Sequence, residues 1–363
     1  MSILIFLVVL VALIVVHELG HFFAAKWFGM RVEEFGLGYP PRAATLATKN
    51  GTEYTLNWLP FGGFVKISGE DESHAIAPDS FAAKPRYQQA IVLLAGILMN
   101  LLFAWVLLTV ALVAGMPRGL TQDEIAKAPD ASLAVYDVLA GSPAAQAGLM
   151  RGDILKGGVA GDDEFSGADV DGFTSFVAAH PNVPIVFDVE RSGEHLSISA
   201  TPESGTVKSA PERAALGVGV APFGTLRVSL LEAPIEGARI TVRATEETAK
   251  GLLNFFGGLF TFTADLSQVS GPVGIAGAVG AASASSFAAL LSLVAIISIN
   301  LALINIVPVP ALDGGRLLFV LIEAILRRPL PSGIANVANT IGFGLLILLI
   351  VIVTGSDILK LFA

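Results

Sequence analysis

The chain lacks cysteine. This absence excludes disulfide bonds and thiolate metal ligands, so a transition-metal site would have to use histidine, aspartate or glutamate. Charge is also scarce, because charged residues make up 15% of the 363 residues while hydrophobic residues make up 53%. Soluble domains carry about 25% charged residues, so several segments should lie in lipid. The formal net charge of −9 argues against a nucleic-acid partner, because phosphate binding needs clustered lysine and arginine.

Long apolar segments indicate membrane helices. A helix needs about 20 mostly apolar residues to span the hydrocarbon core. Four segments qualify: about 2–27, 89–115, 287–309 with a possible extension to 326, and 337–354. The first could also be a cleaved signal peptide, but no lysine or arginine precedes it and no small-residue cleavage site follows, so we expect a retained helix. Polar side chains at membrane depth are costly and usually functional, and the first and third segments contain five: His17, Glu18, His21, Asn300 and Asn305.

Basic residues in the short loops predict the orientation in the membrane. Six lie in the first loop and three in the third: Arg31, Arg42, Lys49, Lys66, Lys84 and Arg86, then Arg316, Arg327 and Arg328. By the positive-inside rule, both loops should be cytoplasmic. Both termini and the long second loop, roughly residues 116–286, would then lie outside.

The first loop is rich in residues that favour β-strands. We expect strands at Arg31–Leu37, Ala43–Thr48 and Thr52–Leu56, with turns at residues 38–41 and 49–51. The stretch that follows, Leu59–Lys66, is unusually apolar for a cytoplasmic loop. Two interpretations stay open: a small soluble hairpin domain, or a β-element that dips back into the membrane beside the first helix. The second is tolerable only where protein or water satisfies the backbone.

The second loop has the composition of a water-soluble domain. Ala131–Pro222 alternates short apolar runs with glycine, aspartate, serine and proline, and a helix is expected around Gly172–His180. Residues 228–265 predict a helix with one charged and one apolar face, which we expect to lie at the outer membrane interface as an amphipathic linker.

The central chemical signal is the sequence His17-Glu18-Leu19-Gly20-His21. Residues i and i+4 share one face of a helix, so both imidazoles can reach one metal ion, and Glu18 is placed to accept a proton from water. Zinc suits imidazole ligands and polarises a scissile carbonyl. A pattern with three fixed positions also arises by chance. However, three ionisable side chains within five residues of an apolar helix are expensive without a function.

A catalytic zinc site has three protein ligands, so a third ligand is required. Asp313 is the best choice, because it follows two prolines and precedes two glycines in Asn305-Ile306-Val307-Pro308-Val309-Pro310-Ala311-Leu312-Asp313-Gly314-Gly315. A broken segment at membrane depth can point a carboxylate inward. The alternative is that Asp313 merely caps a helix that begins near Gly315.

These paired motifs resemble the site-2 protease family, and most closely its bacterial, RseP-like branch, over nearly the whole chain. The resemblance implies that His17, His21 and Asp313 hold Zn²⁺ and that Glu18 is the general base. It implies that Asn305 positions substrate or stabilises the oxyanion; an interhelical hydrogen bond is the alternative. Two further stretches match the family: Leu59–Lys66, the membrane-associated β-element expected to bind substrate through Gly62, Gly63 and Phe64, and the recurrent sequence Ser270–Ala276.

Residues 138–155 in the second loop resemble the protease type of PDZ domain. Such domains can add a peptide strand along an exposed sheet edge. Relatives often carry two PDZ domains, but this loop has room for about one. The usual Asn-Gly after the second strand is replaced by Lys156-Gly157-Gly158, followed by an acidic, glycine-rich insert through Asp171. Peptide binding and exclusion of bulky ectodomains both stay open as the role of this domain.

The predicted fold is thus a polytopic α-helical membrane protein with about four transmembrane helices and an extracytoplasmic PDZ-like α+β domain. The expected parts are a first transmembrane helix at 1–29, the β-element at 30–70, a second helix at 88–116, the PDZ-like domain at 129–222, the amphipathic linker at 225–280, a third helix at 287–327 and a fourth at 337–355.

The resemblance implies a zinc metalloprotease of the bacterial cytoplasmic membrane that cuts within or near the transmembrane segments of other membrane proteins. Its substrates would be an anti-sigma factor already trimmed by another protease, or signal-peptide remnants. Two other functions are weighed against this one: a membrane metal transporter that uses the same ligands, and a non-catalytic scaffold built around the PDZ-like domain. Besides its substrates, the only partner expected is the lipid bilayer.

Overall fold

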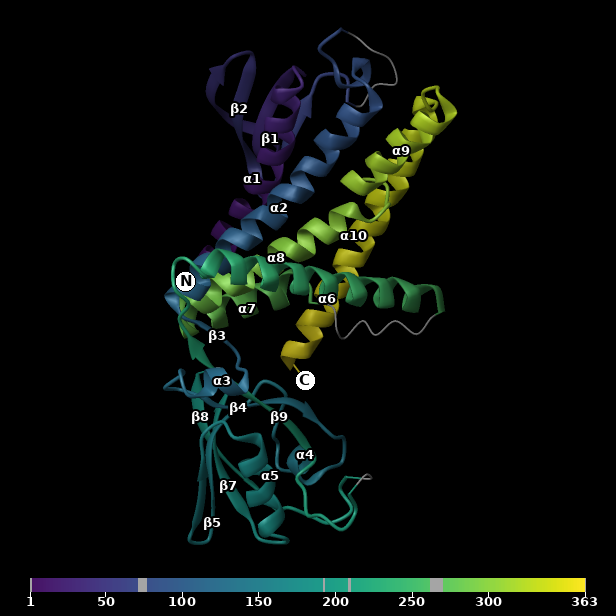
Figure 1. Cartoon of the computed structure of the whole chain (residues 1–363). Helices are drawn as coiled ribbons and strands as arrows, with labels where there is room; N and C mark the ends of the chain where they lie inside the picture. Colours follow the sequence, from purple (N-terminus) through teal and green to yellow (C-terminus); the bar gives the residue numbers. More distant parts are fainter. Residues whose placement is uncertain (1, 71–76, 192, 208–209, 262–269, 363) are drawn as a thin grey trace. The chain divides into compact units, whose positions relative to one another are not determined.

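The structure is a computed structural model that describes residues 2–70, 77–191, 193–207, 210–261 and 270–362. The chain divides into two compact units (Figure 1). The helical unit comprises Met1–Val110, Pro234–Ser283 and Leu290–Ala363, and the β unit comprises Ala111–Ala233 and Ala284–Ala289. Each unit is described by itself below.

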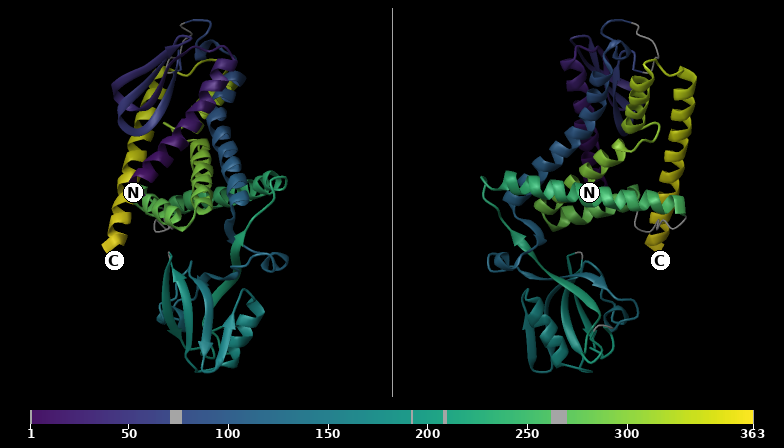
Figure 2. Two further views of the ribbon diagram at one scale, coloured as in Figure 1. Left: turned by 90° about the vertical axis from the view of Figure 1, so that its left-hand side faces the viewer. Right: turned by 45° about the vertical axis from the view of Figure 1, so that its right-hand side comes forward.

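Four helices of the described chain are long and apolar enough to cross a membrane: α1 (Ser2–Trp27), α2 (Arg86–Ala114), α8 (Phe287–Ile306) and α10 (Ser332–Phe362). Their apolar stretches are 20 to 29 residues long, and about 20 residues suffice to span the hydrocarbon core. All four can be followed in Figure 2. The prediction of a polytopic helical membrane protein is therefore confirmed.

The third predicted segment, 287–327, consists of two helices rather than one. Helix α8 ends at Ile306, and α9 begins at Asp313 and ends at Leu326. Between them lie Pro308 and Pro310, which lack the backbone N–H that a helix needs and so interrupt it. Helix α9 is not among the membrane-spanning candidates of the described chain. The break brings a new helix N-terminus, with Asp313 as its first residue, into the helical unit.

The first loop forms a long hairpin of β1 (Val32–Lys49) and β2 (Thr52–Ile67), which packs on α1. The expected turn at Asn50-Gly51 is confirmed: both residues have left-handed φ, 51° and 75°, as a two-residue hairpin turn requires. Residues 38–41, where a turn between two strands was expected, lie inside the single strand β1, so this prediction was wrong. The register changes there, from Tyr39↔Leu59 to Arg42↔Asn57. As a result, residues 34–37 have partners on both sides, 63–66 and 53–56.

A twisted sheet forms most of the β unit. Its strand order is β3-β9-β4-β5-β7-β8, with β6 paired to β5, and the strands are β3 (Met116–Gly119), β4 (Ser132–Val138), β5 (Ile154–Ala160), β6 (Asp163–Ser166), β7 (Ile185–Arg191), β8 (Glu194–Ala200) and β9 (Val218–Leu226). The core packs Phe187, Ile185 and Leu155 from the sheet against Phe173 and Val177. The last two come from α5 (Val170–Ala179), close to the helix expected at Gly172–His180. The β unit also contains the short helices α3 (Gln122–Ile125) and α4 (Pro143–Gln146), and the helical unit contains the short helix η1 (Phe81–Ala83).

The segment expected to be an amphipathic linker, 225–280, contains one whole helix and most of a second. Helix α6 (Ala233–Thr261) carries the expected charged and apolar residues, whereas α7 (Pro272–Ser285) contains no charged residue. Residues 262–269 of that segment lie outside the described residues. In the Ser270–Ala276 stretch, Gly274 N–H donates to the Asp357 carboxylate of α10 at 2.7 Å. A side chain at Gly271 would start 2.8 Å from that same carboxylate, so this stretch serves to dock α7 on α10.

A buried ion pair joins the turn before β5 to the end of β7 in the β unit. The Asp153 side chain is 1% exposed, and both its oxygens accept hydrogen bonds from the Arg191 guanidinium at 2.7 Å. Met150 N–H donates to the same carboxylate at 2.9 Å and closes the turn. Burial by itself raises the pKa of Asp153, but the Arg191 and Met150 hydrogen bonds outweigh it and hold the pKa below its ordinary value.

We predict that Asp153→Asn lowers the stability of the β unit by about 1–3 kcal/mol, because the buried charge-assisted hydrogen bonds are lost. Since folding lowers the pKa of Asp153, its stabilisation is present at neutral pH and is lost as pH falls through that lowered pKa. Amide hydrogen exchange of strands β5 and β7 in the full-length protein measures both effects. Asp188→Asn is the control, because Asp188 is 57% exposed beside His195; equal effects of the two substitutions would contradict the prediction.

Candidate metal centre

Helix α1 places two imidazoles one turn apart, and α9 brings a carboxylate to them. The Nε2 atoms of His17 and His21 are 3.3 Å apart. The Asp313 Oδ2 atom lies 3.0 Å from His17 Nε2 and 3.2 Å from His21 Nε2. Both histidines are buried, 8% exposed each. From segments far apart in the sequence, the fold therefore collects three potential ligand atoms, the only such group of histidine and acidic side chains among the described residues.

The spacing of these atoms fits a tetrahedral metal ion. Zinc binds imidazole nitrogen and carboxylate oxygen at about 2.0–2.2 Å, so two ligands of a tetrahedral ion lie about 3.3 Å apart. The three observed separations are 3.0, 3.2 and 3.3 Å. Three ligand atoms occupy one face of such a tetrahedron and leave the fourth position for water or substrate, as catalytic zinc sites require.

Neighbouring hydrogen bonds direct the lone pairs of the histidines inward. The Nδ1 atom of His21 lies 2.8 Å from the Val92 carbonyl oxygen and so carries the ring proton, which leaves a lone pair on Nε2. The Nδ1 atom of His17 lies 3.2 Å from the Asn100 amide, whose Oδ1 has no partner. Rotating the Asn100 amide by 180° lets its Oδ1 accept a hydrogen bond from the Nδ1–H of His17. The Nε2 atom of His17 then carries no proton and has a free lone pair as well.

The Asp313 Oδ2 atom is buried without a hydrogen-bond donor. Two imidazole lone pairs and this oxygen therefore face one another in apolar surroundings. A buried carboxylate without a compensating charge is strongly unfavourable, so the site calls for a cation. The residues present fit zinc.

Backbone packing determines where Asp313 lies. A side chain at Gly314 would start 2.4 Å from the Ile306 and Val307 carbonyl oxygens, and one at Gly315 would start 2.3 Å from the Val309 carbonyl oxygen. The broken segment thus folds directly onto the first turn of α9. The N-cap of α9 is Leu312, and Asp313 is already helical, so the alternative that Asp313 is only a helix cap was wrong.

Two residues of α2, Gly96 and Asn100, complete the site, and neither was predicted from the sequence. A Cβ on Gly96 would lie 2.4 Å from His21 Nε2 and 2.8 Å from a ring carbon of His17, so only glycine fits against the two rings. A Cβ on Gly20 of α1 would likewise lie only 2.3 Å from the Ala95 carbonyl oxygen of α2. Asn100 orients His17 and is itself completely buried. A glycine and an asparagine in an otherwise apolar span were the signal that could have revealed them.

The remaining predicted site residues lie around the same centre. The Asn305 amide is 3.3 Å from His17 Nε2. Gly63 of the hairpin approaches α1 so closely that a Cβ there would lie 3.5 Å from Glu18 Cγ. Gly62 lies beneath the ring of Tyr39, which stacks on Phe64 with centroids 6.5 Å apart. The structure thus brings Gly63 beside Glu18 and Asn305 beside His17, while Gly62 and Phe64 contact Tyr39 of the same hairpin.

Comparison with known proteins agrees with this geometry. The sequence pattern of peptidase family M50 matches residues 5–349. The chain is 31% identical to zinc metalloprotease RasP of Geobacillus kaustophilus, over 99% of this chain and 98% of the relative. It is 27% identical to zinc metalloprotease RasP of Oceanobacillus iheyensis, over 98% of each. It is also 35% identical, over 96% of this chain and 93% of the relative, to a Nostoc protein whose name places it among the zinc metalloproteases.

The match covers most of the chain, the membrane helices are present, and the three potential ligands meet among them. The chain therefore belongs to peptidase family M50, the site-2 proteases, and is an intramembrane zinc metalloprotease.

Proposed function

We propose that this protease hydrolyses a peptide bond within or near a transmembrane segment of another membrane protein, and that His17, His21 and Asp313 are its zinc ligands. The convergence of three proton-free ligand atoms among apolar helices is the observation that carries the proposal. When bound, zinc supplies Lewis-acid polarisation of the scissile carbonyl and activation of water.

The roles of the neighbouring side chains follow from their places. Glu18 directly follows His17 on α1, the helix that carries both histidines. It takes the proton of the attacking water and returns it to the leaving amine. The Asn305 amide lies 3.3 Å from His17 Nε2, close enough to the centre to donate to a substrate carbonyl oxygen or to the developing oxyanion.

The hairpin is the proposed substrate support. A transmembrane helix hides its amides in internal hydrogen bonds, so its cleavage requires local unwinding. Residues 63–67 have ladder partners only on the side of residues 32–37, so an unwound substrate can pair with their other side as an added strand. Gly62, Gly63 and Phe64 would bind it there, with Gly63 beside Glu18. The exposed apolar side chains Leu46, Leu56 and Trp58 support the interpretation that the hairpin lies in the membrane.

We further propose that the β unit is a PDZ-like domain on the extracytoplasmic side of the bacterial cytoplasmic membrane. A groove of about 480 Å³ runs along β9 and α5 and is lined by Val218, Val220, Phe173 and Val177, together with Leu139 at its rim. This favours binding of an extended peptide. The substrates would be trimmed membrane proteins such as an anti-sigma factor, or signal-peptide remnants.

We predict that Glu18→Gln retains zinc and abolishes cleavage, because an amide cannot accept the water proton while the three ligands are untouched. Elemental analysis of the purified protein and cleavage of a transmembrane test substrate in liposomes measure the two properties. Retained cleavage would refute the proposal. Metal flux that persists in Glu18→Gln would favour a transporter, and protein without metal would favour a scaffold.

Gly96→Ala is expected to reduce zinc affinity by at least about tenfold, because the new methyl group would occupy the space of His21 Nε2 and supporting positions typically cost 10–100-fold in metal affinity. Zinc titration against a chelator measures this. Gly344→Ala in α10 is the matched control, since a methyl group added there would have no neighbouring atom within 4 Å. Normal zinc affinity in Gly96→Ala would contradict the assigned ligands.

For the groove, we predict that Leu139→Glu weakens binding of a fluorescent peptide with an apolar, free C-terminus by about tenfold or more, since a charge at the rim opposes apolar contact. Fluorescence anisotropy with the full-length protein measures it. Val186→Glu, an equally exposed position on β7 outside the groove, is the control. Equal affinity of both variants would contradict peptide binding in this groove.

A further inference from the structure

Helices α2 and α9 each present one continuous stripe of residues that leads to the metal centre. With about 100° per residue, the α9 residues Asp313, Arg316, Val320 and Glu323 lie within roughly 80° of one another around the helix axis. The same holds for the α2 residues Arg86, Gln89, Leu93, Gly96 and Asn100. One end of each stripe is the metal centre, through Asp313, Gly96 and Asn100. The other end of each stripe is charged.

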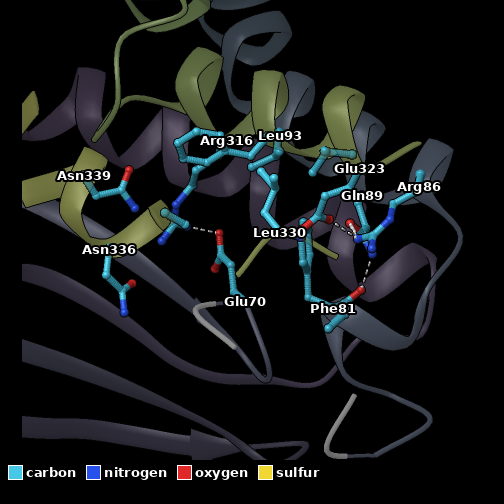
Figure 3. A pocket seen from close by; sticks show the side chains of 14 residues that line it. Glu70, Phe81, Arg86, Gln89, Leu93, Arg316, Glu323, Leu330, Asn336 and Asn339 are labelled. Atoms are coloured by element: carbon cyan, nitrogen blue, oxygen red, sulfur yellow. Dashed lines mark hydrogen bonds and ion pairs between the residues drawn. The ribbon is translucent and has the colours of Figure 1, made fainter. Parts of the chain in front are cut away.

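Two ion pairs hold the charged part of the α9 stripe, as Figure 3 shows. Arg86 of α2 pairs with Glu323 at 2.8 Å, and the other oxygen of Glu323 accepts the Leu330 N–H at 2.8 Å. Arg316, one turn after Asp313, pairs with Glu70, which follows the hairpin. Both acids are largely buried, with side chains 15% and 14% exposed. Partly buried pairs of this kind constrain geometry more than exposed ones do.

Apolar packing covers only part of the region between these elements: Val320 of α9 lies in a buried cluster with Val92 and Leu93 of α2. A cavity of about 110 Å³ lies beside this cluster, lined by both ion pairs together with Gln89, Leu93 and Val320. Across the cavity, interdigitating side chains cannot constrain the rotation of α9. The ion pairs add that constraint to the apolar contact of Val320.

The metal centre has little tolerance for rotation of α9. A side-chain oxygen lies about 5–6 Å from the helix axis, so a rotation of about 10° moves it by about 1 Å. Metal–ligand distances tolerate only about 0.2 Å. The Arg316 and Glu323 contacts lie roughly 4.5 Å and 15 Å along the axis from Asp313, and two such attachments on one face fix both tilt and rotation.

We propose that Arg86, Glu323, Arg316 and Glu70 are positioning residues, whose two ion pairs hold α9 in the rotation that brings Asp313 to its metal. This inference rests on the proposed function, because it takes Asp313 as a zinc ligand. The contacts given above join the four residues in two pairs and join Glu323 to Leu330. They act through α9.

The test measures zinc affinity and kinetics in the full-length protein in liposomes. Arg86→Glu, which places two carboxylates together, should weaken zinc binding by about 10–100-fold in chelator competition and lower kcat by a similar factor, with KM within about twofold of wild type. The visible spectrum of the cobalt-substituted protein should change, since it reports ligand geometry. Arg86→Lys keeps the pair and should behave as wild type. Adding Glu323→Arg to Arg86→Glu should recover at least part of both losses, because the pair is restored in reverse.

Arg118→Glu is the matched control, because Arg118 forms a partly buried 2.6 Å pair with Glu124 in the β unit. It should leave zinc affinity and kcat unchanged. Arg86→Glu could instead yield less folded protein while each folded molecule binds zinc with wild-type affinity. That result would show that the pair is purely structural and would overturn the inference. So would failure of the reversed pair to recover any affinity. If the wild-type protein and Arg86→Glu bind zinc and cleave substrate equally well, this inference alone is overturned. If the wild-type protein binds no zinc, the proposed function is overturned as well.

Discussion

Three electron-pair donors that meet without a proton between them are the constraint on which the helical unit depends. His17, His21 and Asp313 approach within 3.0–3.3 Å, and the helices around them are apolar. Such a cluster repels itself unless a cation lies in its centre. The binding energy of a metal at such a site is also folding energy, since the ligands converge only in the folded chain. Chemistry and stability of the helical unit are therefore linked.

Close approach of backbones makes this convergence possible. Gly20 and Gly96 let α1 and α2 touch at the histidine pair, and Gly314 and Gly315 let the broken segment fold onto α9. Gly342 of α10 accommodates the Pro310 carbonyl oxygen, and the Asn339 side chain accepts the Ala311 N–H at 3.2 Å. In lipid, where the hydrophobic effect does not drive helix association, small residues provide this tight packing. A side chain at any of the first four would displace a ligand or the backbone that carries it.

Several charged groups of the helical unit lie in pairs or small networks. On the hairpin, Arg42 lies 3.0 Å from Glu34 and 2.7 Å from Glu53, and Thr55 donates to Glu34 at 2.6 Å. On the side of α9, the two ion pairs of the cavity serve the same purpose. Paired charges are tolerated in surroundings of low dielectric constant, where single charges are not.

The sequence alone determined the class of the protein and most of its chemistry. Apolar segments of sufficient length, a His-Glu-x-x-His pattern inside one of them and a proline-broken segment ending in Asp313 are local features, and their physical meaning does not depend on the rest of the chain. Tertiary structure decided the remainder: that α9 is a separate helix, that Gly96 and Asn100 belong to the site, that β1 runs through residues 38–41, and that Arg86 meets Glu323. These depend on which faces of distant segments come together, and no residue pattern within one segment records its neighbour in space.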